Sequence, residues 1–188
     1  MGVDLEKARP GPNDRTAART VRASHGAWLV MVRDARLLLI AVWLGAAVFF
    51  SFAVAPSAFS VLPARELAGT LVSRTVTILH IGGLVVSLLL LISAPLMRAT
   101  TSRSAFYAEI AALAVMAAAT AVGQWVIAAR LQALRLAMGR PIDEVAQNDP
   151  LRVAFNSLHG YSVIVLLTGM IAAGVALLLI ARQAPRKG

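Results

Sequence analysis

The stretch VAFNSLHGYSVIVLLTGMIAAGVALLLIA, residues 153–181, contains 29 consecutive residues without a lysine, arginine, aspartate or glutamate. Crossing about 30 Å of hydrocarbon takes roughly 20 residues of α-helix, because each residue advances the helix by about 1.5 Å. This stretch is therefore long enough to span a bilayer as a single helix.

Three further uncharged runs precede it, at residues 37–64, 75–97 and 110–129. The four runs together hold 100 of the 188 residues, and the whole chain is 59% hydrophobic and only 14% charged. A soluble domain is nearer 45–50% apolar and about 25% charged. This composition excludes a water-soluble globule and predicts one small multi-pass membrane domain.

The prolines and charged residues at the ends of the uncharged runs predict the boundaries of four spans. Proline interrupts helices, so Pro56 and Pro63 indicate that residues 57–64 form a connection rather than a helix. The spans are then expected at about 37–54, 75–96, 105–129 and 158–181. The longest connection is 130–152, whose first half could extend the third helix beyond the bilayer.

Short connections make consecutive spans antiparallel, which predicts an all-α, integral membrane up-down four-helix bundle. The transmembrane domain is placed at 28–184, and the polar segment 1–27 is predicted to be a disordered cytoplasmic tail. Glycine and alanine should line the helix contacts, because lipid gives no hydrophobic drive for helix association.

Charge predicts the topology. The chain has 18 basic and 9 acidic residues. Twelve of the basic residues fall on the side of the two termini and six on the other side, which predicts cytoplasmic termini in an inner membrane. Because the arginines flank apolar runs, they indicate contact with membrane lipid and not with nucleic acid.

Several chemistries find no support in the residues. The chain has no cysteine, which excludes disulfides and thiolate metal sites. It contains no serine-hydrolase, phosphate-loop or zinc-protease motif. The sequence therefore favours a protein that is not an enzyme.

Polar residues at membrane depth are the candidates for function, because they are costly in hydrocarbon. Counting from the span ends places Ser51, His80, Gln124 and His159 in one layer of the outer leaflet. His80, Gly83 and Ser87 share one helix face, and a second stripe contains Asn156, His159, Ser162 and Gly169.

Three interpretations of this layer remain open. Two neutral imidazoles on facing helices could ligate a haem iron or a transition-metal ion. Alternatively, each histidine could hydrogen-bond across helices and fix the packing, or it could bind and release protons. The candidate ligand-binding residues are His80, His159, Gln124, Asn156 and Ser162, of which His80 and His159 are the metal candidates.

Other polar and aromatic residues receive structural interpretations. Glu109 is the only acidic residue within a span. Either Arg98 or Arg103 in the adjoining turn could pair with it, or its carboxylate could reach the lipid headgroups. The three tryptophans, Trp28, Trp43 and Trp125, are interpreted mainly as anchors at the membrane interface.

The segment DPLRVAFNSLHGYS, residues 149–162, resembles the transmembrane-protein-205-like family of four-span proteins, whose molecular activity is not established. Phe155, His159, Gly160 and Ser162 carry the most specific part of this resemblance, and His80 adds to it. The eukaryotic member is linked to platinum-drug resistance, so the resemblance implies metal or drug handling. More loosely, the chain looks like bacterial copper-resistance membrane proteins.

The leading hypothesis is a membrane protein with an outer-leaflet polar pocket around His80 and His159 that binds a metal ion or haem and assists metal tolerance. The alternative is an accessory subunit of a larger membrane complex, with no ligand of its own.

Overall fold

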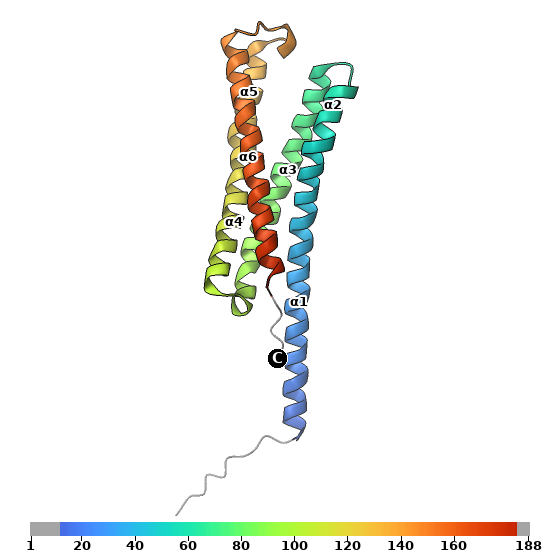
Figure 1. The fold of residues 1–188 in the computed structure, drawn as a ribbon, viewed down its shortest axis with the longest axis vertical. Coiled ribbons are helices and arrows are strands. Elements are labelled where there is room, and N and C mark those ends of the chain that lie inside the picture. Colours follow the sequence, from blue (N-terminus) through green and yellow to red (C-terminus); the bar gives the residue numbers. More distant parts are fainter. Residues whose placement is uncertain (1–11, 184–188) are drawn as a thin grey trace, which may run out of the picture.

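The computed structural model describes residues 12–183 as four long helical rods joined by short connections (Figure 1). Four of these helices are long and apolar enough to cross a membrane. The part of the chain that is described contains no strand. The predicted all-α four-helix membrane bundle is therefore confirmed, and a multi-pass protein in a lipid environment follows from it.

The first rod consists of α1 (Pro12–Phe49), the π-helical segment η1 (Phe50–Val54) and α2 (Ala55–Val61); the second consists of α3 (Arg65–Ser93) and the 3₁₀ segment η2 (Ala94–Thr100). The third rod consists of α4 (Arg103–Ala121), the π-helical segment η3 (Val122–Ala128) and α5 (Ala129–Met138). A short 3₁₀ turn, η4 (Ile142–Glu144), leads to α6 (Pro150–Ala181). We call the end where α1 enters the bundle and α6 finishes the terminal end, and the end with the 62–64 and 139–149 connections the distal end.

The first connection is shorter than predicted, because the helix continues through Pro56. The amide of Ala55 bonds to the carbonyl of Phe50, five residues back, in the wide turn that directly precedes the proline. A wide π-turn re-routes the backbone bonds near Pro56, whose nitrogen has no hydrogen to donate. The predicted connection at 57–64 was wrong in extent, and only residues 62–64 lie between the helices.

The third rod extends past the predicted span, in agreement with the expected helical first half of the 130–152 connection. It ends after Met138 at Gly139, whose φ of +64° is the left-handed conformation that often terminates helices. The carboxylate of Asp149 then accepts the Leu151 amide at 2.8 Å and caps α6. As a result, α6 begins eight residues before the predicted boundary at 158.

The N-terminal segment differs from the expectation of disorder over 1–27. The structure is helical from Pro12, so residues 12–27 form the beginning of α1. Residues 1–11 lie outside the described residues. In Figure 1 this part of α1 projects beyond the other helices at the terminal end.

The core is centred on Trp43, which is 5% exposed and donates its indole N–H to the Leu79 carbonyl at 2.9 Å. The interpretation of Trp43 as an interfacial anchor was therefore wrong, whereas Trp28 and Trp125 are more than half exposed. The indole fills the space that the absent side chain of Gly83 leaves between the helices. A Cβ on Gly83 would lie 2.8 Å from the indole ring.

Candidate functional site

His80 lies in the middle of α3 and faces the interior of the bundle. Its side chain is 2% exposed, and neither ring nitrogen has a hydrogen-bond partner among the described residues. The ring rests against Gly123 of η3, where a Cβ would come within 2.5 Å of Cε1 and 2.6 Å of Nε2. Gly123 is thus the position that admits the imidazole, and the π-helical geometry of η3 falls at the same place.

The helix face that His80, Gly83 and Ser87 were predicted to share points into the bundle. His80, Gly83 and Ser87 are all buried, and Ser87 donates its hydroxyl to the Leu84 carbonyl at 2.9 Å. Of the small residues expected at contacts, Gly83, Ala119, Gly123 and Gly169 do face other helices. Gly45 and Gly174 meet nothing within 4 Å.

Gln124 directly follows the glycine that touches His80. The side chain is half-buried, and its Oε1 atom is buried without a hydrogen-bond partner in the described residues. The sequence expectation that His80 and Gln124 lie at a similar depth agrees with this adjacency. Two polar groups at this depth, the imidazole of His80 and the amide oxygen of Gln124, are thus without a hydrogen-bond partner in the described residues.

His159 has different surroundings from His80. It is exposed on α6 and stacks in parallel on Phe155, with ring centroids 6.4 Å apart. The Arg135 guanidinium lies 5.2 Å from the centroid of the Phe155 ring and donates to the Ser73 hydroxyl at 3.0 Å. These contacts place His159 beside the polar groups near the distal end.

Two other predicted site residues, Asn156 and Ser162, lie on α6 together with His159. Asn156 is exposed, and the half-buried Ser162 donates its hydroxyl to the His159 carbonyl at 2.7 Å. Ser51 donates to the Ala47 carbonyl at 2.8 Å within its own helix. The structure thus keeps His80 with the region of Gln124 and does not join these groups to His159, Asn156 and Ser162.

The positions of His80 and His159 limit which residues could bind a metal ion or a haem together. Among the side chains that the structure describes, those of residues 26–98 and 101–183, no three histidine, aspartate or glutamate side chains gather in a way that could hold a metal ion. The His80 ring packs on the backbone of η3, whereas His159 stacks on Phe155, so the two rings do not face a common space as a pair of axial haem ligands would. Of His80 and His159, only the imidazole of His80 faces the interior of the bundle.

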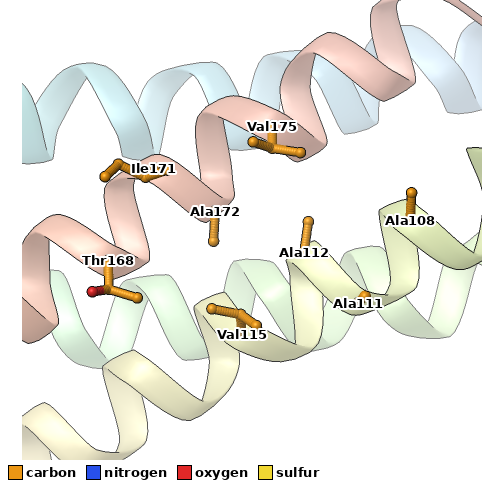
Figure 2. Close-up of a pocket in the computed structure, with 8 residues that line it drawn as sticks. All are labelled: Ala108, Ala111, Ala112, Val115, Thr168, Ile171, Ala172 and Val175. Carbon is orange, nitrogen blue, oxygen red and sulfur yellow. The ribbon is translucent and has the colours of Figure 1, made fainter.

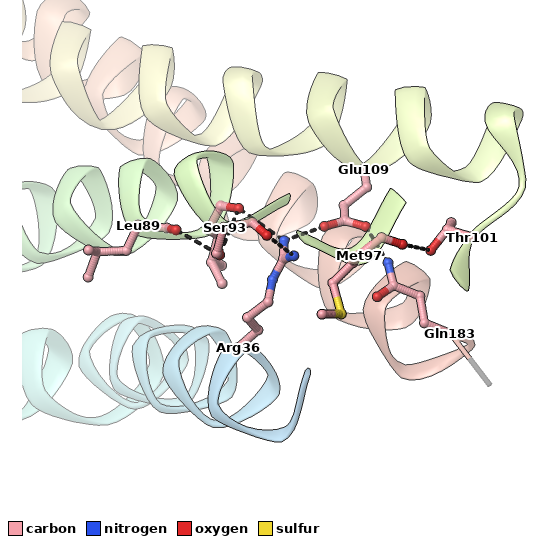
Figure 3. A network of polar contacts seen from close by, with 8 residues as sticks. Arg36, Leu89, Ser93, Met97, Thr101, Glu109 and Gln183 are labelled. Atoms are coloured by element: carbon pink, nitrogen blue, oxygen red, sulfur yellow. Dashed lines mark hydrogen bonds and ion pairs between the residues drawn. The ribbon is translucent and has the colours of Figure 1, made fainter. Parts of the chain in front are cut away.

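A second polar cluster, which we call the terminal network, consists of Arg36, Glu109 and Gln183 (Figure 3). An Arg36 amino group contacts Glu109 Oε1 at 2.5 Å, and Gln183 donates its amide N–H to Glu109 Oε2, also at 2.5 Å. Arg36 and Glu109 are almost completely buried. Glu109 therefore neither pairs with Arg98 or Arg103 nor reaches the headgroups, which were the two alternatives that the sequence left open.

The same guanidinium also reaches the end of α3. It donates to the carbonyl oxygens of Leu90 at 3.0 Å and Ser93 at 3.3 Å. Arg33 donates to the backbone carbonyl of Gln183 at 3.1 Å. The terminal network thereby joins α1, α3, α4 and the residues that follow α6.

The spacing of inward-facing residues along α1 and α4 is the sequence pattern that could have predicted the terminal network. Over residues 26–54, the buried positions of α1 and η1 are Arg36, Ile40, Trp43, Ala47 and Phe50, which repeat every three or four residues. Arg36 therefore continues the inward face of α1 by one turn. In α4, Glu109 stands on the same face as the buried Leu113 and Met116.

Comparison with known families places the chain. A family model described as a domain of unknown function, DUF4149, matches residues 38–140, more than half of the sequence. The chain belongs to the DUF4149 family. The matched segment of this DUF4149 protein includes His80, Glu109 and Gln124 and ends before His159.

The comparisons with curated proteins and with solved structures assign no function to the chain. No curated protein and no solved structure matches this DUF4149 chain. The resemblance to the transmembrane-protein-205-like family and to copper-resistance proteins stays a prediction. The inner membrane and the cytoplasmic side of the termini stay predictions as well.

Proposed function

We propose that this DUF4149 protein is a membrane-embedded binding protein that holds a metal ion or another small polar ligand at His80. The observation that carries the proposal is the imidazole itself, which is 2% exposed and has two unpaired nitrogens. Leaving one buried polar group unpaired costs about 1–3 kcal/mol. A ligand that pairs with the ring recovers this free energy.

The chemistry of the ligand follows from the two polar groups that lack a partner, the imidazole of His80 and the amide oxygen of Gln124. A neutral imidazole offers one N–H donor and one nitrogen lone pair, and Gln124 Oε1 adds an acceptor. A transition-metal ion suits the imidazole nitrogen, whereas a small molecule with a donor and an acceptor suits both groups. A metal ion held here needs further ligands that it brings with it, such as water. If the ligand is a haem, His80 would be the residue that holds its iron.

The experiment compares the two helix histidines. The full chain is purified from cells supplied with copper, zinc and haem, and its absorption spectrum and metal content are measured for the wild type, His80→Gln and His159→Gln. We expect a bound species in the wild type and in His159→Gln that is lost in His80→Gln. Size-exclusion profiles and helix content verify that each variant is folded.

Two results would refute the proposal. One is a wild-type protein from supplied cells that carries neither metal nor a small molecule detectable by mass spectrometry of its extract. The other is a bound species that both histidine variants retain equally.

The accessory-subunit function is the second candidate, and exposed polar residues on α6 favour it. Asn156 and His159 are exposed in the single chain. Polar side chains exposed in a membrane helix are costly unless another protein surface or the interface covers them. Gentle solubilisation should then recover a second protein at fixed stoichiometry, and Asn156→Leu/His159→Leu should release it. Recovery of a free monomer would refute this candidate.

A further inference from the structure

Two surface regions of the bundle lie outside the site at His80, and they differ in chemistry. A shallow groove between α4 and α6 is lined by alanine, valine and isoleucine side chains together with Thr168 (Figure 2). The Thr168 hydroxyl donates to the Ile164 carbonyl at 2.9 Å within its own helix, so nothing in this groove specifies an occupant. The distal end, in contrast, brings together basic and aromatic side chains from three helices.

Arg135 of α5 is held at the distal end by groups from two other helices. Its Nη1 atom donates to the Ser73 hydroxyl of α3 at 3.0 Å, and its guanidinium carbon lies 5.2 Å from the centroid of the Phe155 ring of α6. Gly69 of α3 lies alongside, since a Cβ at this position would be 3.6 Å from Nη2. A guanidinium has five N–H donors, and Ser73 is the one acceptor that it meets among the described residues. Because Arg135 is exposed, its remaining donors are available to a ligand.

His159 lies against the same aromatic ring as Arg135. Its imidazole stacks in parallel on Phe155, with ring centroids 6.4 Å apart, and the positive charge of Arg135 acts on it. The ring is exposed, and its nitrogens form no hydrogen bond with the side chains that the structure describes. A neutral imidazole has one N–H donor and a protonated one has two, so His159 offers a donor in either state.

The charge of Arg135 is not compensated by an acidic side chain. The three ion pairs among the described side chains involve other arginines. Glu66 shares the face of α3 that carries Ser73, but it is seven residues away, which is about 10 Å by helical rise. A positive charge with several free N–H donors beside a second donor favours an anion with several oxygen atoms.

The depth of the cluster matches the headgroups of a bilayer. Ser73 comes two residues before the uncharged run 75–97, and Arg135 comes six residues after the uncharged run 110–129. By helical rise these separations are about 3 Å and 9 Å, which bracket the headgroup layer of roughly 5–8 Å outside the hydrocarbon. Phosphate groups are the anions that a membrane supplies at this depth.

We propose that Arg135 and His159 bind one phosphate group at the distal end. The planar fork of the guanidinium donates to two phosphate oxygens, and the imidazole N–H donates to a third. A phospholipid headgroup and free phosphate both carry this group. The site is independent of His80, so failure of the ligand-binding function proposed above leaves this inference intact.

The test measures the binding of two phosphate sources to the full-length protein in detergent. One arm titrates phosphatidic acid and follows the lipid-bound protein by native mass spectrometry. The other measures inorganic phosphate by equilibrium dialysis at constant ionic strength. We expect saturable one-to-one binding in at least one arm, and the source with the lower dissociation constant is the ligand. Absence of saturable binding in both arms would overturn the proposal.

Variants then assign the binding to this cluster. Arg135→Gln should weaken it at least about five-fold, because a basic side chain near a membrane surface contributes about this much in affinity for an anionic group. Arg135→Lys keeps the charge but not the planar fork, and should restore only part of the affinity. His159→Ala removes one hydrogen bond and should weaken binding by about two- to ten-fold. Since His159 is exposed, this variant keeps the test decisive if Arg135→Gln does not fold.

Two further variants serve as controls. Arg65 is an arginine at the same end of the bundle, but its charge is paired with Asp143 at 3.5 Å, so Arg65→Gln should bind as the wild type does. His80→Gln should also bind normally, because His80 is buried elsewhere in the bundle. An equal loss in Arg65→Gln and Arg135→Gln would show general attraction by positive charge and would overturn the proposal. Unchanged binding in both Arg135→Gln and His159→Ala would overturn it as well.

Discussion

The buried ion pair between Arg36 and Glu109 makes the sharpest prediction about stability. The two side chains are 3% and 1% exposed, and their closest atoms are 2.5 Å apart. Removing one member of such a pair leaves the other charge buried and unpaired, which costs about 3–5 kcal/mol. Replacing both members by apolar side chains of similar size is often close to neutral. We therefore expect Arg36→Met and Glu109→Leu each to destabilise strongly, and the double variant to recover most of the loss.

The assay is unfolding of the purified protein in detergent micelles, followed by helix content during a temperature ramp. For a chain of this size, 1 kcal/mol corresponds to about 2–4 °C in the midpoint, so each single variant should melt about 6–20 °C earlier. Arg65→Gln is the control, because the Arg65–Asp143 pair is exposed and 3.5 Å long. Loss of this exposed pair should lower the free energy of unfolding by at most about 1 kcal/mol.

Two results would contradict this reasoning. If the double variant loses as much as the two single variants combined, the two charges do not act as a pair. If each single variant loses less than the Arg65→Gln control, water reaches the network and the burial seen in the structure does not describe the protein in a membrane.

Two glycine substitutions give the remaining predictions. Gly123→Ala would place a Cβ 2.5 Å from the His80 ring and should lower the melting midpoint by the cost of overpacking, about 1–3 kcal/mol. Gly45→Ala adds the same methyl group where nothing lies within 4 Å and should not destabilise, so equal midpoints for the two variants would refute the steric argument. Gly139→Ala meets no neighbouring atom, but its φ of +64° costs a side chain about 1–2 kcal/mol, and Gly139→Asn should cost less. A lower midpoint for the asparagine variant than for the alanine variant would show that backbone strain is not the cause.

The fold could be predicted from the sequence because run length and charge decide it. Four uncharged runs of at least 20 residues leave few alternatives to four spans. The boundaries were less predictable. Pro56 reads as a helix breaker, whereas a wide turn over Phe50–Val54 lets the helix pass through it. Neither this turn nor its partner at Val122–Ala128 has a recognisable pattern in the residues.

The candidate site was only partly predictable, because sequence gives the depth of a residue better than its rotation about the helix axis. In a soluble helix the polar face reveals the rotation, but both faces of a membrane helix are apolar. His80 was placed on the correct face because Gly83 and Ser87 mark it. For α6 the inward face is set by the contact of Gly169 with Ala119, which leaves His159 exposed.

Because of the terminal network, the two ends of the bundle differ in the free energy that local opening requires. At the terminal end the buried side chains of Arg36, Glu109 and Gln183 join all four rods. At the distal end the buried cluster of Met138, Val145 and Phe155 joins only the third and fourth rods, and the polar contacts of Arg65 with Asp143 and of Arg135 with Ser73 are exposed. Exposed bonds open at lower free energy than buried ones. We therefore expect the rods to separate transiently at the distal end more often than at the terminal end. Amide hydrogen exchange should then be fastest near the 62–64 and 139–149 connections.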